Sequence, residues 1–203
     1  MMSDLPPILI AAAKLDKLKW VVQNLPYAPV PLSERPQIEL PEETGSSFMQ
    51  NATLKAVRAS EQFEGLVIAS DGGVRIPALS AAWDELRTGR AAGVGTSEAE
   101  KANHLLSLMK DKVGEERHVY WSEAVALAYD GDVLSNFEME ATEGLLSEAY
   151  DPTNAIPGFW VYSLWIFPSL EQRYVDLSPE ELAGVDVNWQ ILKAMVESWY
   201  RET

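Results

Sequence analysis

The stretch Pro41–Ala56 reads PEETGSSFMQNATLKA and places two adjacent acidic residues, a glycine and a lysine close together in the chain. Ser46 or Ser47 can cap a helix that runs to about Phe63, because a serine oxygen accepts hydrogen bonds from the first free N–H groups of a helix. Apolar residues recur roughly on one side of that segment. The stretch therefore predicts an acidic loop followed by an amphipathic helix that carries Lys55.

Segments on either side of this helix alternate between strand and helix patterns. Ile8–Ala13 and Leu66–Ser70 are short apolar runs typical of buried strands, and Lys14–Asn24 has helical spacing. Asp71-Gly72-Gly73 predicts a sharp turn into Val74–Leu79. We further expect a helix from Ser97 to about Lys110, strands Val119–Tyr129 and Val133–Thr142 joined at Asp130-Gly131-Asp132, a loop over Tyr150–Gly158, and helices from Ser178 and over Trp189–Tyr200. The pattern predicts a mixed α/β fold.

Length and charge narrow the function classes. The 203 residues suit one domain, and 31 acidic against 16 basic residues give a net charge of −15. This balance argues against binding to nucleic acid polymers or anionic membranes, although a few local lysines can still bind a small polyanion. We expect no signal peptide at Met1–Leu9, and Gly158–Pro168 is too short to span a bilayer. A cytoplasmic location is the expectation.

Few side chains are available for covalent or histidine-based catalysis. The chain has no cysteine, which excludes thiolate catalysis and zinc–sulfur sites, and its two histidines do not suggest a catalytic triad. Glu42-Glu43, Lys55 and Asp71 could together hold a magnesium triphosphate. A strand, a turn and a helix starting near Lys14 can also present N–H groups to phosphate. Each pattern alone is more often structural than functional.

Taken in order, these segments resemble the inosine triphosphate pyrophosphatase family from Ile8 to about Val196. Pro41–Ala56 is similar to the family's E-E-T-G-x-(T/S)-F-x-E-N-A-x-x-K-A, and Ala69–Val74 to A-D-D-S-G-L. Arg90–Gly93 is similar to A-R-(Y/F)-A-G, the helix from Ser97 to T-D-x-x-N-x-x-x-L-L, and Gly158-Phe159 to the start of G-F-G-Y-D-P. The resemblance implies one domain over residues 1–203. It also implies a central twisted mixed sheet flanked by helices, in an elongated two-lobed shape with a nucleotide cleft.

The resemblance also implies an activity: Mg-dependent hydrolysis of a nucleoside triphosphate to the monophosphate and pyrophosphate by a homodimer. Glu42 and Asp71 would bind the magnesium ion, and Asp71 would orient or activate the attacking water. Substrate-binding positions implied by the resemblance are Lys14, Lys17, Lys55, Gly72, Phe159 and Trp160. Such chemistry depends on positioning and charge neutralisation rather than on covalent intermediates.

Several positions depart from the family pattern. Ala12-Ala13-Lys14 stands for Thr-x-Asn, Gln50 for the Glu of E-N-A, Ser70 for the first Asp of D-D-S-G, Trp160-Val161-Tyr162 for Gly-Tyr-Asp, Leu182 for a lysine, and Val187-Asn188-Trp189 for His-Arg-Gly. The residues that would bind the metal and phosphate are thus partly retained, whereas the residues that would recognise the base are almost all replaced. Three hypotheses follow: a pyrophosphatase with altered base preference, a non-catalytic relative that binds a nucleotide or a protein, and a protein whose cleft is filled by Trp160 and Trp189.

Overall fold

The computed structural model describes residues 5–12, 14–155 and 159–203, which divide into two compact units. Unit 1 contains residues 1–72, 123–139 and 188–203, and unit 2 contains residues 73–122 and 140–187. A single domain over residues 1–203 stays a prediction. Among the helices of the described residues, none is both long and apolar enough to cross a membrane.

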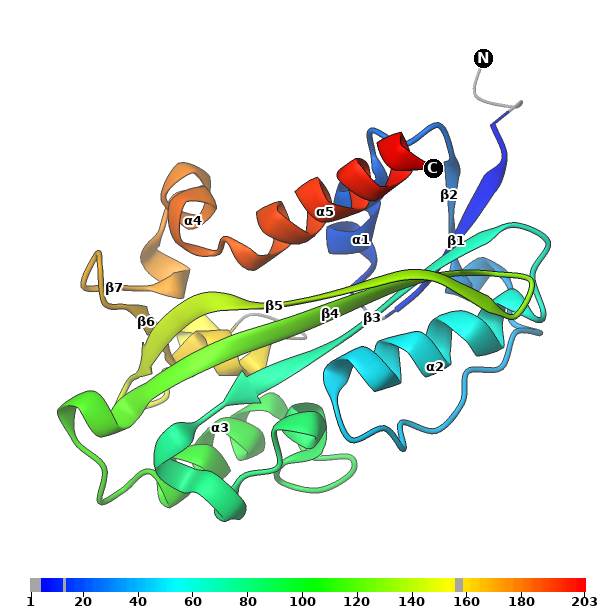
Figure 1. The fold of residues 1–203 in the computed structure, drawn as a ribbon. Helices are drawn as coiled ribbons and strands as arrows, with labels where there is room; N and C mark the ends of the chain where they lie inside the picture. Colours follow the sequence, from blue (N-terminus) through cyan, green and yellow to red (C-terminus); the bar gives the residue numbers. More distant parts are fainter. Residues whose placement is uncertain (1–4, 13, 156–158) are drawn as a thin grey trace. The chain divides into compact units, whose positions relative to one another are not determined.

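The described strands form a mixed seven-stranded sheet in the order β2-β1-β3-β4-β5-β6-β7 (Figure 1). The strands are β1 Pro7–Ala11, β2 Ala28–Pro31, β3 Leu66–Arg75, β4 His118–Tyr129, β5 Asp132–Leu146, β6 Trp165–Phe167 and β7 Gln172–Arg173. β1 pairs in parallel with β2 and β3, whereas β6 pairs antiparallel with β5 and β7. The predicted α/β fold with a mixed sheet is confirmed.

Three of the described helices begin at capping serines. Unit 1 contains α1 Leu15–Val22, α2 Phe48–Ser60 and α5 Asn188–Glu202, and unit 2 contains α3 Glu98–Leu108 and α4 Pro179–Val185. Ser47 Oγ accepts the Gln50 N–H at the start of α2, and Ser97 and Ser178 begin full capping boxes. A side-chain cap satisfies N–H groups that have no partner within the helix, which fixes where each helix starts.

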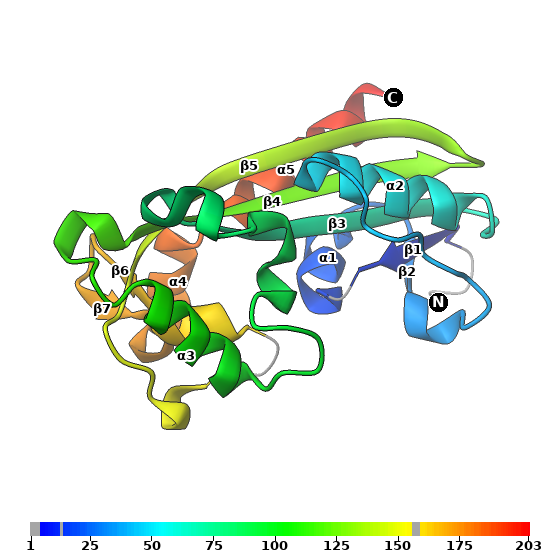
Figure 2. The ribbon, with the colours of Figure 1, turned by 90° about the horizontal axis from the view of Figure 1, so that it is seen from below.

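In unit 1, helices cover both faces of the strands. α1 and α5 lie on one face and α2 lies on the other (Figures 1 and 2). Ile10, Ile68 and Val125 belong to the core that α1 and α5 cover. Since successive side chains of a strand point to opposite faces, the alternate residues Val67 and Ala69 face α2. Successive side chains of β3 in unit 1 therefore face α2 and the α1–α5 layer in turn.

The expected turn at Asp71-Gly72-Gly73 is wrong, because β3 continues through these residues to Arg75. Gly72 and Gly73 do not have positive φ, and both belong to the extended backbone of β3. β3 lies between β1 and β4 in the sheet, and strand pairing overrides the local preference of glycine for turns. Within the segment Val74–Leu79, which was expected to follow the turn, β3 ends at Arg75 and a 3₁₀ helix, Pro77–Ala82, begins. Ala13, in the strand expected over Ile8–Ala13, lies outside the described residues.

The hairpin between β4 and β5 is confirmed, with positive φ at both turn residues. Asp130 has φ 49° and Gly131 has φ 83°. Two-residue turns of this kind match the right-handed twist of the strands that they join. β5 ends at Leu146, beyond the predicted Thr142.

Unit 2 has an aromatic core that includes Trp83, Trp160, Tyr162 and Trp165. Gly144 of β5 lies directly against Trp165 of the neighbouring strand β6, where a Cβ atom at position 144 would be 2.2 Å from the indole Nε1 and Cε2 atoms. A contact this short is impossible without movement of the indole ring. The glycine is therefore required by the packing of Trp165.

We expect Gly144→Ala to lower the free energy of unfolding by about 3 kcal/mol, because the added methyl group overpacks the Trp165 contact. Gly184→Ala is the matched control, since Gly184 lies in α4 and its added Cβ would meet nothing within 4 Å. The control should be neutral or stabilising by up to about 1 kcal/mol. Denaturant unfolding followed by tryptophan fluorescence measures both, and equal effects of the two variants would contradict the packing argument.

Candidate functional site

Asp71 lies just beyond the point where β1 stops pairing with β3. The last residue pair between these strands is Ala11 with Ala69. Asp71 is two residues further along β3, so its side chain points to the same face as Ala69, the face covered by α2. The position brings the carboxylate within reach of polar residues from α2.

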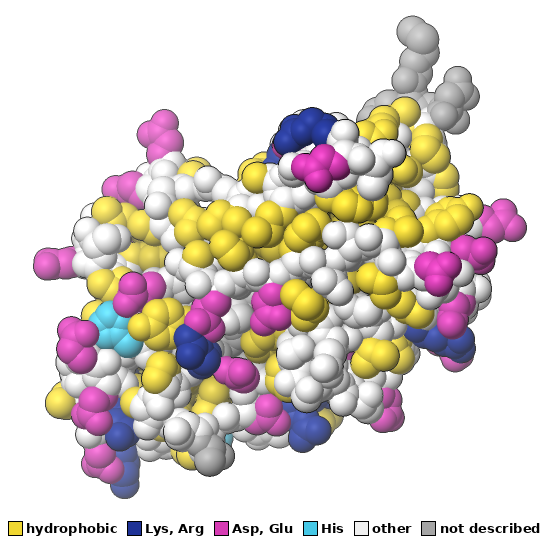
Figure 3. Space-filling view, viewed as in Figure 1, with side chains coloured by type: hydrophobic (Ala, Val, Ile, Leu, Met, Phe, Trp, Pro, Cys, Tyr) yellow, Lys and Arg dark blue, Asp and Glu magenta, His cyan; other side chains and the backbone are white. Residues whose placement is uncertain are grey.

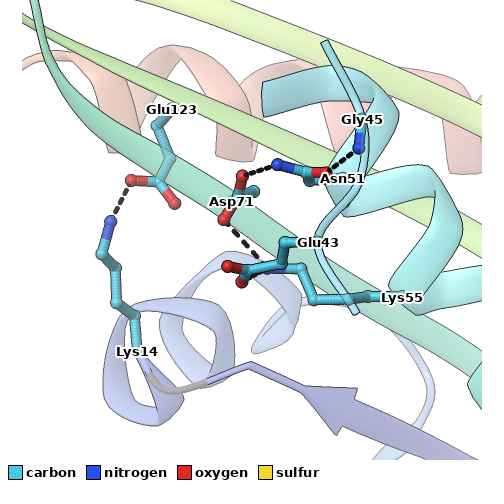
Figure 4. A network of polar contacts seen from close by, with 7 residues as sticks. All are labelled: Lys14, Glu43, Gly45, Asn51, Lys55, Asp71 and Glu123. Carbon is cyan, nitrogen blue, oxygen red and sulfur yellow. Dashed lines mark hydrogen bonds and ion pairs between the residues drawn. The ribbon is translucent and has the colours of Figure 1, made fainter. Parts of the chain in front are cut away.

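Two residues of α2 hold the Asp71 carboxylate (Figure 4). Lys55 Nζ donates to Asp71 Oδ1 at 3.0 Å, and Asn51 Nδ2 donates to Asp71 Oδ2 at 3.0 Å. Lys55 also contacts Glu43 Oε1 at 3.3 Å. Asn51 and Lys55 are four residues apart and share one face of the helix. Each oxygen of Asp71 is therefore fixed by a different turn of α2.

Asn51 also ties the preceding loop to this carboxylate. The Gly45 N–H donates to Asn51 Oδ1 at 2.8 Å. A Cβ atom at Gly45 would lie 2.6 Å from the same oxygen, so this close approach requires glycine. Gln50, which stands where the resembling family has Glu, accepts the Ser46 N–H at 2.8 Å. The neutral side chain thus still bonds to the loop backbone.

A second ion pair joins the residue directly before α1 to β4. Lys14 Nζ donates to Glu123 Oε2 in a close contact (Figure 4). The Glu123 side chain is fully buried, and that of Lys14 is 19% exposed. The Lys14 ammonium also lies 5.7 Å from the centre of the Trp189 ring. Sequence reasoning missed Glu123, although a lone acidic residue within the apolar run of β4 was a visible signal.

The structure brings two of the predicted site residues together directly. Lys55 and Asp71 form an ion pair, and Lys55 also contacts Glu43. Glu42 is exposed in the loop before α2, and Lys17 is partly buried on α1. The approach of Glu42 to Asp71 and the convergence of Lys17 with Lys55 stay predictions.

Two other predicted substrate-binding residues belong to unit 2. Trp160 is buried in a 3₁₀ helix, with its ring 6.5 Å from that of Trp83. Phe159 is partly buried, 6.1 Å from the Tyr162 ring. Gly158, part of the quoted Gly158-Phe159 motif, lies outside the described residues. Within unit 2, Trp160 is a core residue, and its contact with a substrate stays a prediction.

Similarity to known proteins extends over nearly the whole chain. The model of the Ham1 family matches residues 8–197, nearly the whole chain. The chain belongs to the Ham1 family. A dITP/XTP pyrophosphatase of Exiguobacterium sibiricum is 28% identical over 194 residues, covering 91% of this chain and 90% of the relative. One of Leptospira interrogans is 36% identical over 141 residues, covering 69% and 68%.

Solved structures of Ham1 proteins have the same fold. The Coxiella burnetii HAM1 protein superposes with a TM-score of 0.79 at 22% identity, covering 96% of this chain and all of the other. A Mycobacterium abscessus structure described as a nucleoside-triphosphatase and dITP/XTP pyrophosphatase gives 0.73 at 25% identity, covering 93% and 98%. The family resemblance read from the sequence is confirmed.

For this Ham1 protein we expect Lys55 and Asp71 to be energetically coupled. A double-mutant cycle with Lys55→Met, Asp71→Asn and the double variant should give a coupling energy of about 2 kcal/mol, because these side chains are only 10% and 13% exposed. Arg58 and Glu61, on or next to the same helix, are the control pair, with side chains 51% and 45% exposed. Their coupling should stay below about 1 kcal/mol. Urea unfolding measures both cycles, and similar values would contradict a special role for the Asp71 pair.

Proposed function

We propose that this chain is a nucleoside triphosphate pyrophosphatase that cleaves its substrate to a nucleoside monophosphate and pyrophosphate. The observation that carries the proposal is the fixed Asp71 carboxylate beside the Lys55 ammonium. These residues occupy the acidic and lysine positions of motifs similar to the family's motifs. The relatives named dITP/XTP pyrophosphatase support the same class of reaction.

The donor set of this site fits magnesium supplied together with the substrate. Glu43 and Asp71, together with the predicted ligand Glu42, offer the hard oxygen atoms that Mg²⁺ prefers. Within residues 5–12, 14–155 and 159–203, no group of three acidic, histidine or cysteine side chains is arranged to hold a metal. Mg²⁺ commonly binds to one or two carboxylates and completes its shell with phosphate oxygens and water. Bound there with the substrate, the ion would neutralise charge on the phosphate oxygens.

The chain's own residues would position water and phosphate. We assign Asp71 to accept a hydrogen bond from the attacking water and to orient it toward the α-phosphorus. The water oxygen forms a bond to phosphorus and its proton passes by way of the Asp71 carboxylate to solvent, while the bond from phosphorus to the bridging oxygen breaks and pyrophosphate leaves with that electron pair. Lys55 has three N–H donors and can bond to Asp71 and to phosphate oxygens together. Asn51 keeps the second Asp71 oxygen in place.

The wild-type chain should release pyrophosphate from at least one nucleoside triphosphate with magnesium, and chelation of the metal should abolish the release. Asp71→Asn should lower kcat/KM by about a hundredfold or more, because the amide cannot replace the charge of the carboxylate. Asp111→Asn, at an exposed position after α3 of unit 2, is the control and should change kcat/KM less than twofold. Absence of activity toward every nucleotide would favour the non-catalytic alternative, and full activity of Asp71→Asn would exclude the role given to Asp71.

We further propose that base preference is relaxed relative to the dITP/XTP pyrophosphatases. Trp160, Val161 and Tyr162, which stand in the segment similar to the family's base-reading one, are buried in the apolar core of unit 2. Apolar side chains cannot replace the hydrogen bonds by which a site distinguishes one base from another. We therefore expect weaker discrimination between bases, while hydrolysis of the triphosphate is retained.

Relaxed preference predicts that ITP and dGTP differ from dCTP and dUTP by less than about a hundredfold in kcat/KM, whereas a site that bonds to polar base groups can discriminate by about 10⁴-fold. Calorimetric titration with the same four nucleotides separates weak discrimination from loss of binding. A preference for ITP above a hundredfold would show that the base pocket lies elsewhere. No binding of any nucleotide would support a filled cleft.

The homodimer and the cytoplasmic location implied by the resemblance are also proposals. Support for a dimer comes from unit 1, where Tyr129, Val133 and Leu134 expose apolar surface around the β4–β5 hairpin. Apolar surface of this kind is common at sites of protein association.

A further inference from the structure

Glu123 is a fully buried carboxylate inside an otherwise apolar part of β4. Burying a charged group is costly unless it is paired, and removing one partner of a buried pair leaves the other uncompensated. The cation here is Lys14, the residue directly before α1. The buried carboxylate of β4 is thus paired with a lysine at the start of α1.

Strand alternation places Glu123 on the face that α1 covers. Val125 belongs to the core under α1 and α5, and Glu123 is two residues away on β4, so both point to the same face. Ser70, two residues from Ile68 of that core, faces the same side from the adjacent strand β3. The carboxylate of Glu123 therefore stands beneath the start of α1, on the strand next to the one that carries Asp71.

Lys14 is held from two directions. Its ammonium bonds to the Glu123 carboxylate and lies 5.7 Å from the centre of the Trp189 ring of α5. An aromatic face attracts a cation, which adds to the restraint set by the carboxylate. A long lysine side chain loses rotamer freedom when it binds a ligand, and a lysine that is already fixed loses less.

We propose that Glu123 is a positioning residue that fixes the Lys14 ammonium for binding the phosphate chain of the substrate. The proposal rests on the proposed function and on the substrate-binding position that the family resemblance implies for Lys14. An ammonium group has three donors, so bonding to a carboxylate is compatible with bonding to phosphate oxygens. Glu123 does not touch the substrate and acts only through Lys14.

The test measures the binding of inorganic tripolyphosphate to the full chain by calorimetry. Glu123→Gln keeps the side-chain shape and removes its charge. Removal of a negative charge alone would strengthen the binding of an anion. We expect the opposite, with tripolyphosphate bound about tenfold more weakly, which corresponds to about 1.4 kcal/mol. The KM for a hydrolysed nucleotide should rise by a similar factor, with kcat changed less than threefold.

Glu64→Gln is the matched control, because Glu64 is exposed in unit 1 and loses the same charge. Its tripolyphosphate affinity should stay within twofold of the wild type. The variant Lys14→Met with Glu123→Gln, which leaves no buried charge at this pair, should bind no more than about threefold more weakly than Glu123→Gln alone. That result is expected if the single substitution has already removed the contribution of Lys14.

Unchanged or stronger binding by Glu123→Gln would overturn the proposal. A further loss of tenfold or more in the double variant would also overturn it, because Lys14 would then work without Glu123. A lowered melting temperature with unchanged tripolyphosphate affinity would show a purely structural pair. Failure of the wild type to hydrolyse any nucleotide would contradict the proposed function but leave the tripolyphosphate comparison decisive for Glu123.

Discussion

The ion pair between Lys55 and Asp71 is the interaction on which the rest of the site depends. Both side chains are largely buried, so the carboxylate at the end of the β1–β3 pairing needs a cation from α2. This requirement fixes the rotation of the helix about its axis. Asn51, one turn earlier, then meets the other Asp71 oxygen and the Gly45 N–H. A single charge on β3 thus determines the positions of α2 and of its preceding loop.

The charge balance of unit 1 explains why a metal belongs to the proposed chemistry. Lys14 and Lys55 are paired with Glu43, Asp71 and Glu123, so two cations meet three carboxylates. Acidic side chains are also spread over the visible face of the protein rather than gathered in one patch (Figure 3). A triphosphate entering this field meets no surplus of positive charge among these five groups. A divalent cation that binds to carboxylate and phosphate together removes that repulsion.

Local signals in the sequence predicted more of the fold than of the site's contacts. The α2 start at Ser47 and the Asp130-Gly131 turn follow from capping and turn chemistry that act within a few residues. Asp71-Gly72-Gly73 was misread because neighbouring strands, which the local sequence does not show, keep it extended. Likewise, the partners Lys14 and Glu123 are 109 residues apart, and no local pattern links them. The family motifs include Asp71 and Lys55. Only the fold shows that Asn51 holds Asp71 and that Glu123 holds Lys14.

The two lysines differ in how exposed their carboxylate partners are, and this difference suits two roles in the proposed reaction. Lys55 contacts carboxylates that keep some exposure, with the Glu43 side chain 32% exposed, so substrate and metal can compete for those groups. Lys14 is bonded to a carboxylate whose side chain has no exposure. A lysine that can exchange partners can pair with the negative charge that develops on the bridging oxygen as its bond to phosphorus breaks. A lysine in a fixed position instead defines where the phosphate chain lies. Positioning by fixed groups is most of what a phosphoryl-transfer site must provide.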